Sequence, residues 1–254
     1  MPAAAGSVGW TRADRLILAG AVLAGVAIRV ALLPSDGLRG DLDQFAGWIH
    51  HIATRGLGSL YAGTDAGPVT FGPVMAYVWS LLAAVQPAFG TVVDASDPAI
   101  RALMKVPASL ADLGLAGLVV FALRDRPRWA ALSGAALLLV PATWYVSAWW
   151  GQYESIFALS GLAAVVAAMR GRQGLAAALV AVALMTKPQA VAFLVPFAAW
   201  FWATGGWRGI ARAVVIGSVV VAVLWLPFIP SGGPAGYLRN LGVYQNEIFN
   251  VLSL

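Results

Sequence analysis

The chain has 254 residues, of which 60% are hydrophobic and only 11% are charged, and its mean hydropathy is +0.80. These values exclude an ordinary soluble domain. The absence of cysteine excludes a disulfide framework, thiol catalysis and cysteine metal sites. The net charge of +5 comes from short basic clusters between apolar runs, which is typical of the cytoplasmic loops of a membrane protein and predicts no nucleic-acid partner.

The apolar runs predict an all-α integral membrane bundle of about seven transmembrane helices. The basic leader Met1–Arg15 runs directly into the first of them, so it is not a cleavable signal peptide. The predicted spans are Leu16–Leu33, Arg101–Leu123, Trp129–Ser147, Ser155–Met169, Gly174–Thr186, Gln189–Thr204 and Ile210–Ile229. The clusters predicted to be cytoplasmic are Arg12/Arg15, Arg124/Arg126/Arg128, Arg170/Arg172 and Arg208/Arg212.

Residues 34–100 are predicted to form one long extracytoplasmic loop that carries juxtamembrane helices. Gly72–Gly90 is apolar enough to cross, but a crossing there would place Arg124–Arg128 outside, so we expect a re-entrant or surface-lying helix. Asp41–Arg55 has its apolar residues at helical spacing and charged residues elsewhere around the wheel. That pattern predicts an amphipathic helix lying on the membrane.

The segment Gly174–Thr204 is flanked by arginine clusters at both ends, so it must cross twice or not at all. Each half has roughly 14 residues, or ~21 Å of helix, which is shorter than a ~30 Å hydrocarbon core. The turn at residues 186–189, broken by Pro188, should therefore lie below the outer membrane surface. Lys187 in this turn either faces a polar chamber or snorkels to the interface.

Nearly every unusual polar residue falls near the external end of a predicted span or in the external loop. The carboxylates are Asp41, Asp43, Asp112 and Glu154; the cations are Arg101, Lys105, Lys187 and Arg239; uncharged candidates are Trp150, Gln152 and Gln189. Cations on the external side run against the positive-inside trend, so we expect them to bind an anion such as a lipid phosphate. A carboxylate beside that phosphate could act as a general base toward an acceptor hydroxyl.

The carboxylates also have structural interpretations. Asp41 could be the N-cap of the surface helix, and Asp43 could be solvated. Glu154 could lie at a helix start, where the helix dipole favours a carboxylate. Asp112 could pair with Lys105 and stabilise a span.

Other candidates are weaker. Trp150 could belong to the interfacial aromatic belt instead of binding substrate. His50 and His51 are adjacent and would point in different directions on a helix, so we expect no metal site there. No Walker loop, GxSxG, HExxH or GxGxxG pattern is present, so nucleotide hydrolysis, serine hydrolase and zinc protease activities are not supported.

Taken in order, the motifs resemble those of the GT-C superfamily of membrane glycosyltransferases, especially bacterial relatives of the dolichyl-phosphate-sugar-dependent mannosyl- and glucosyltransferases. The matching pieces cover about residues 10–254: Asp41-Leu42-x-x-Phe45-x-x-Trp48, Phe71-Gly72-Pro73 with Tyr77, Lys105-Val106-Pro107 with Asp112, Trp150-Gly151-Gln152-x-Glu154-Ser155, Thr186-Lys187-Pro188-Gln189, and Leu226-Pro227-Phe228 with Tyr237. Gly72 stands where relatives usually have proline, and Glu154 where they usually have aspartate.

The resemblance implies an inner-membrane, multi-pass enzyme with an extracytoplasmic active site. It would transfer a hexosyl residue, with mannose the first choice, from a polyprenyl-phosphate-sugar to a lipid, glycan or protein acceptor, with inversion. The resemblance makes Asp41 the catalytic base and places Lys105 and Lys187 near the lipid phosphate. Asp43 and Glu154 are further catalytic candidates, Arg101 and Arg239 further phosphate-binding candidates, and Trp150, Gln152, Gln189 and Tyr237 substrate-binding candidates. No cofactor is implied, and dependence on a divalent metal cannot be read from these residues.

The end of the chain and two other functions complete the predictions. Asn246–Leu254 resembles the start of a segment that relatives continue into further spans, which predicts that this single transmembrane module is the N-terminal part of a longer enzyme. The alternatives to transfer are a transporter of polyprenyl phosphate or small solutes, and a non-catalytic scaffold. A transporter would be expected to show inverted repeats or paired broken helices, and only one broken pair is visible in the sequence.

Overall fold

The computed structural model describes residues 9–62 and 67–252, with side chains described as far as Val243. This part of the chain contains helices and no β-strand. The α-helices are α1 (Arg12–Leu32), α2 (Arg39–Arg55), α3 (Pro73–Val85), α4 (Pro98–Ala122), α5 (Pro127–Leu139), α6 (Pro141–Trp144), α7 (Glu154–Met169), α8 (Gln173–Leu184), α9 (Leu194–Trp225) and α10 (Gly233–Leu252). Short turns of 3₁₀ or π-helix are η1 (Leu57–Ser59), η2 (Pro87–Gly90), η3 (Tyr145–Trp150), η4 (Pro188–Phe193) and η5 (Leu226–Ser231).

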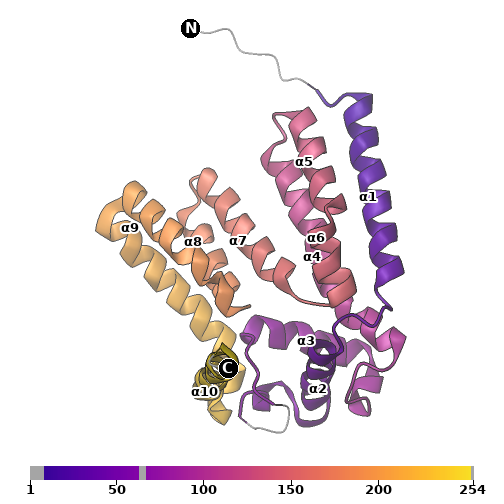
Figure 1. Cartoon of the computed structure of the whole chain (residues 1–254). Coiled ribbons are helices and arrows are strands. Elements are labelled where there is room, and N and C mark those ends of the chain that lie inside the picture. Colours follow the sequence, from indigo (N-terminus) through magenta and orange to yellow (C-terminus); the bar gives the residue numbers. More distant parts are fainter. Residues whose placement is uncertain (1–8, 63–66, 253–254) are drawn as a thin grey trace.

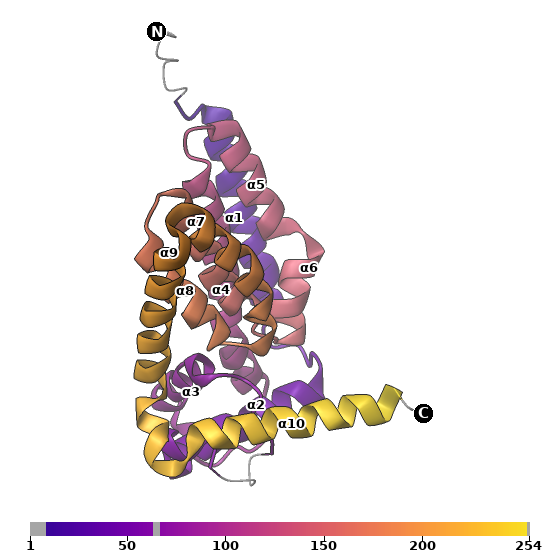
Figure 2. The same ribbon diagram turned by 90° about the vertical axis from the view of Figure 1, so that its left-hand side faces the viewer.

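The helices form two layers (Figure 1). The long helices run side by side, with α1, α4 and α5 packed together and α7 joining them to α8 and α9. Helices α2, α3 and α10 lie at one end of this bundle, and α10 runs across its long axis (Figure 2). The bundle was predicted from the apolar runs, and the crosswise layer comes largely from the predicted external loop.

The four arginine clusters gather at the opposite end of the bundle. Arg128 Nη1 lies 3.5 Å from Asp14 Oδ1, which joins the start of α5 to the start of α1. Arg170 stacks over the Phe121 ring at 3.8 Å, which joins the end of α7 to the end of α4. Gln173 donates to Thr204 at 3.1 Å, next to the kink in α9. We call this the arginine end, and the end that carries α2, α3 and α10 the loop end.

The number of helices able to cross a membrane is smaller than the seven predicted. Within the described part of the chain, three are long and apolar enough: α1, α4, and the continuous stretch Pro188–Ser231 that contains α9. A fourth is obtained if α5 and the segment Pro141–Trp150, bent by 44°, count as one span. Helices α7 and α8 occur where expected, but at 16 and 12 residues they measure only ~24 and ~18 Å.

Gly206 divides the long α9. Its φ of 54° and ψ of −146° are non-helical, and they fold the two halves of the helix back along each other near the arginine end. The sequence placed two spans here, Gln189–Thr204 and Ile210–Ile229, and the turn between them coincides with this kink. By length and composition, the described residues therefore form an all-helical structure in which three helices, or four with the bent pair, could cross a membrane.

The apolar face of α2 packs inside the protein and not on a membrane. Phe45, Trp48 and Ile49 are at most 1% exposed. Trp48 contacts Trp79 of α3 with ring centroids 5.0 Å apart. The prediction that this helix lies on the bilayer by its apolar face is wrong, because α3 and the segments around it cover that face. Helix α3 itself is only 13 residues long, which agrees with a helix that does not cross.

Candidate functional site

Five polar residues from three segments meet at the loop end of the bundle. Asp41 Oδ2 accepts hydrogen bonds from Trp150 Nε1 at 2.7 Å and from Gln152 Nε2 at 2.6 Å. Gln152 Oε1 in turn accepts from Lys187 Nζ at 3.1 Å, and Lys187 Nζ lies 2.5 Å from Glu154 Oε1. We call Asp41, Trp150, Gln152, Glu154 and Lys187 the Asp41 cluster. These residues were all predicted, but as separate candidates.

Asp41 does not cap its helix. Helix α2 begins at Arg39, and its N-cap residue Leu38 makes no side-chain cap. Asp41 stands in the first turn, where the helix dipole favours a carboxylate, and its bonds go to side chains more than 100 residues away. The local interpretation of Asp41 is therefore wrong.

Glycine shapes the segment that carries Trp150, Gln152 and Glu154. Gly151 has a left-handed conformation with φ of 94°, which favours glycine, and it ends η3. A Cβ at Gly151 would lie 2.5 Å from Leu42 Cδ2 and 3.3 Å from Lys105 Cγ. The segment thus passes directly over α2 and α4, where a larger residue does not fit.

A backbone contact brings Lys187 to the same place. Gly72 N–H donates to Thr186 O at 3.1 Å, and Val74 N–H donates to Met185 O at 3.1 Å. This contact sets Phe71 beside Lys187, whose Nζ lies 4.8 Å from the ring centroid, a cation–π distance. The short α8 ends here, so the predicted break before Pro188 delivers Lys187 to the loop end.

The cluster is only partly satisfied. Lys187 is 8% exposed, and its ammonium group bonds Gln152 and Glu154 inside the protein. The side chain therefore does not snorkel to the membrane interface. The side chain of Glu154 is 42% exposed, yet its Oε2 is buried and has no hydrogen-bond partner. One carboxylate oxygen next to an ammonium group is therefore available for a further donor. Two carboxylates against one lysine also leave the cluster with a formal charge of −1.

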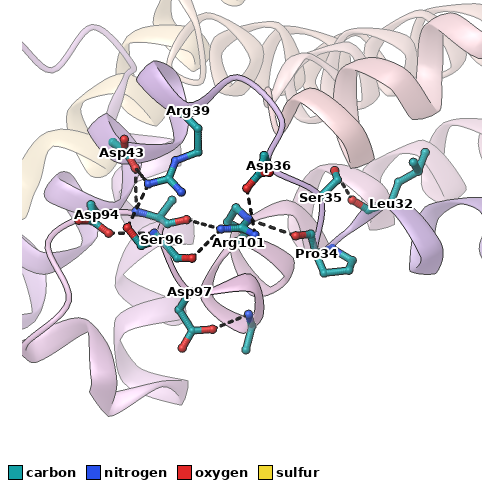
Figure 3. A network of polar contacts seen from close by, with 12 residues as sticks. Leu32, Pro34, Ser35, Asp36, Arg39, Asp43, Asp94, Ser96, Asp97 and Arg101 are labelled. Carbon is teal, nitrogen blue, oxygen red and sulfur yellow. Dashed lines mark hydrogen bonds and ion pairs between the residues drawn. The ribbon is translucent and has the colours of Figure 1, made fainter.

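Arg101 and Asp43 hold the segment of residues 34–96 together (Figure 3). Arg101 donates to Pro34 O, Ala95 O and Ser96 O at 2.7–3.1 Å and lies 3.2 Å from Asp36. Asp43 accepts from the Ala95 N–H at 2.8 Å and from Arg39 at 2.9 Å. The structure does not bring these two candidates into contact with the Asp41 cluster, and their bonds fix where α2 begins.

Lys105 lies just behind the cluster. Its side chain is fully buried, and Nζ donates to Ser35 O at 2.8 Å and to Ser35 Oγ at 3.1 Å. Its stem lies beneath Gly151. The remaining candidates are not in the cluster: Gln189 and Arg239 are exposed on η4 and α10. Tyr237 packs edge-on against Tyr61, and burial raises the pKa of its hydroxyl to about 12.

Asp112 has a different partner from the one predicted. Its Oδ2 accepts from Arg29 Nε at 3.0 Å and Nη2 at 2.8 Å, and both side chains are 3% exposed or less. Ser147 and Ser155 also donate to Asp112. Pairing of Asp112 with Lys105 is wrong. Arg29 was not among the predicted site residues, although an arginine within the apolar run 16–33 is itself an unusual signal.

The arrangement supplies an anchored carboxylate, a buried ammonium group and a free carboxylate oxygen within one hydrogen-bonded cluster. Such a set can accept a proton from a hydroxyl and can bind a phosphate or another anion. Among the described residues, no three His, Asp or Glu side chains are placed to hold a metal ion. Comparison with models of protein families gives no match, and comparison with curated proteins finds none similar to this chain.

Proposed function

We propose that this protein is an inverting, polyprenyl-phosphate-sugar-dependent hexosyltransferase of the GT-C type, with mannose the first choice of sugar. The observation that carries the proposal is the contact of Asp41 with Gln152 and, through that amide, with Lys187. A candidate base and a candidate phosphate ligand come from distant parts of the sequence and meet at one end of the bundle. The order of the motifs that resemble this superfamily supports the same activity.

In this proposal Asp41 takes the proton of the acceptor hydroxyl as that oxygen attacks the anomeric carbon of the donor. The bond between that carbon and the phosphate oxygen breaks, and the lipid phosphate leaves. Trp150 and Gln152 donate to Asp41 Oδ2, which fixes the direction in which Oδ1 points. Because both donors hold one oxygen, the other can accept the proton.

The donor phosphate would be bound by Lys187, with Lys105 behind Gly151 as a second positive charge. Lys187 already bonds Glu154 and Gln152 and faces Phe71, so phosphate binding requires the phosphate to take the place of the Glu154 carboxylate. The partial exposure of Glu154 allows its side chain to swing away. Two exposed residues complete the proposed contacts: Gln189, two residues after Lys187, and Arg239 of α10, which follows η5. We propose them only as outer contacts of the donor or acceptor.

An apolar groove next to α8 could hold the lipid tail of the donor. A groove of about 490 Å³ lies between α8 and the two halves of α9, lined almost wholly by apolar residues that include Leu184, Phe197 and Val221. Leu184 is the last residue of α8, three before Lys187. A chain lying in this groove would therefore bring its head group toward the Asp41 cluster.

The proposed location is the inner (plasma) membrane, with the loop end outside the cytoplasm. The support is the collection of all four arginine clusters at the other end. The chain has no cysteine, so single cysteines can report this directly. We expect Ser96→Cys, exposed at the loop end, to react with a membrane-impermeant maleimide added outside, and Thr204→Cys to react only after permeabilisation. The reverse pattern would exclude the proposed orientation.

The activity is tested with the full chain in proteoliposomes supplied with radiolabelled polyprenyl-phosphate-mannose, and separately with the glucose donor. A membrane extract added to the proteoliposomes supplies endogenous lipid and glycan acceptors, and the label should move to them. Asp41→Asn should lower the rate 10²–10⁴-fold, the usual contribution of a general base, while donor binding persists. The matched control is Asp97→Asn, since Asp97 N-caps α4 and asparagine caps about as well.

Two outcomes would reject the proposal. Transfer that is equally fast in Asp41→Asn would remove Asp41 as the base. Release of donor or solute to the other side of the vesicle without transfer would instead favour the transporter.

A further inference from the structure

Inside the bundle, one carboxylate joins four helices. Asp112 of α4 bonds Arg29 of α1, Ser147 of η3 and Ser155 of α7. All four residues are buried, with exposures of 0–8%. We call these residues the Asp112 cluster. None of them belongs to the Asp41 cluster.

Arg29 also repairs a break in the neighbouring span. Helix α5 ends at Leu139, and the extended backbone at Val140 interrupts the helix before α6, so the carbonyl of Leu138 is left without a helical partner. The missing N–H of Pro141 frees Leu137 O, which accepts from Thr143 Oγ1 at 2.8 Å. Arg29 Nη1 donates to Leu138 O and to Gly25 O, both at 3.0 Å. A freed carbonyl inside a membrane is tolerated only when protein satisfies it, and here the arginine does so. Arg29 therefore fixes both Asp112 and the bend between α5 and η3.

The two serines lie on either side of the segment that carries the candidate site. Ser147 Oγ donates to Asp112 Oδ2 at 2.5 Å, and Ser155 Oγ donates to Asp112 Oδ1. Between them lie Trp150, Gln152 and Glu154 of the Asp41 cluster. Both ends of this segment are thus tied to the same carboxylate group.

We infer that Asp112, oriented by Arg29, positions the segment 147–155 so that Trp150 and Gln152 meet Asp41. Asp112 and Arg29 are positioning residues that do not touch the substrate; that this matters for transfer rests on the proposed function. The geometry of the segment itself does not depend on that function. Loss of the two serine bonds would free the segment while leaving the Arg29–Asp112 ion pair intact.

The test combines Ser147→Ala and Ser155→Ala in the full chain and reads the position of Trp150 by ¹⁹F NMR. The protein is labelled with 5-fluorotryptophan, and Trp150→Phe identifies the Trp150 signal among the 11 tryptophans. We expect that signal to shift or broaden in the double variant more than the other tryptophan signals. Asp41→Asn is the reference variant, because it shows how the Trp150 signal changes when the hydrogen bond from Trp150 to residue 41 is weakened. Transfer by the double variant should fall by about 10²-fold, the cost of an ångström-scale misplacement.

Ser160→Ala is the matched control, because Ser160 also lies on α7 but donates only to Ile156 O within its own helix. A Trp150 signal unchanged by the double variant, or changed equally by Ser160→Ala, would overturn the inference. If the double variant does not fold, the two single variants carry the same comparison. The NMR result holds even if no transfer is found, so a failure of the proposed function and a failure of the positioning role remain distinguishable.

Discussion

The Asp112 cluster and the Asp41 cluster contain similar groups in different states of satisfaction. Each has a carboxylate, a cation and neutral hydrogen-bond donors. Around Asp112 the carboxylate accepts four hydrogen bonds, and the arginine reaches two backbone carbonyls as well. Around Asp41 the bonds form an open row that ends at Glu154 Oε2, which is buried without a partner.

The difference shows which cluster can take part in chemistry. A fully bonded buried network has no site left for a ligand, and removing one member leaves the others unpaired. An incompletely bonded cluster at a half-exposed carboxylate can accept a ligand without breaking the fold. The Asp112 cluster is therefore suited to positioning, and the Asp41 cluster is suited to binding and proton transfer.

The largest effect that separates the two clusters is expected from Arg29→Met. This change leaves Asp112 as an uncompensated buried charge and frees Leu138 O. The free energy of unfolding should fall by about 3–5 kcal/mol, the usual cost of removing one partner of a buried pair. Equilibrium unfolding in mixed detergent and SDS micelles measures it.

Arg29→Met combined with Asp112→Leu is the control for that experiment. Replacing both charges should recover most of the lost stability, since an apolar pair of similar volume is often neutral. A stability loss in the double variant as large as in Arg29→Met would contradict the assignment of the loss to an unpaired charge.

In the Asp41 cluster, Lys187→Met should weaken donor binding more than it lowers the stability of the fold. The side chain of Glu154 is 42% exposed and can turn to water when Lys187 is lost. Binding of polyprenyl phosphate should weaken by roughly 1.5–3 kcal/mol, the scale of a hydrogen bond to a charged group. Isothermal titration in nanodiscs measures this binding, with Arg208→Met at the arginine end as the control. Unchanged donor affinity would separate Lys187 from the phosphate.

The sequence predicted elements better than contacts. Hydrophobic periodicity and proline positions placed most helices within a few residues, because those signals are local. The number of crossings could not be obtained the same way, since α8 has only 12 residues and is apolar throughout. The five members of the Asp41 cluster were named, but their meeting depends on the left-handed turn at Gly151.

Contacts over long sequence distances account for the other differences. Arg29 lies 83 residues from Asp112. Its place in an apolar run is unusual, but the sequence does not show which carboxylate it pairs with. The apolar face of α2 was taken for a membrane-binding face, because the sequence does not show that α3 returns to cover it. Amphipathicity shows that a face is buried, and not what buries it.

A smaller effect is expected from Gly72→Ala, which tests the contact that places Lys187. A Cβ at Gly72 would lie 2.2 Å from Met185 O, too close without a shift of the backbone. Gly72 also donates its N–H to Thr186 O, which explains why proline does not fit at this position. Overpacking of this kind costs about 1–3 kcal/mol. Thermal unfolding measures it, with Gly90→Ala as the control because a Cβ there meets nothing within 4 Å.

The smallest effect should come from Asp43→Asn, on the same helix as Asp41. The Asp43 pair with Arg39 is more than a third exposed on both sides, and an asparagine oxygen can still accept the Ala95 N–H. Surface pairs of this kind contribute about 0.2–1 kcal/mol, so stability should fall by no more than that. Transfer should stay close to the unmodified rate, because Asp43 does not bond any member of the Asp41 cluster. Parallel assays of Asp41→Asn and Asp43→Asn decide between the two carboxylates. If Asp43→Asn abolished transfer and Asp41→Asn did not, Asp43 would be the base, and the site would lie on the face of α2 that carries Asp43.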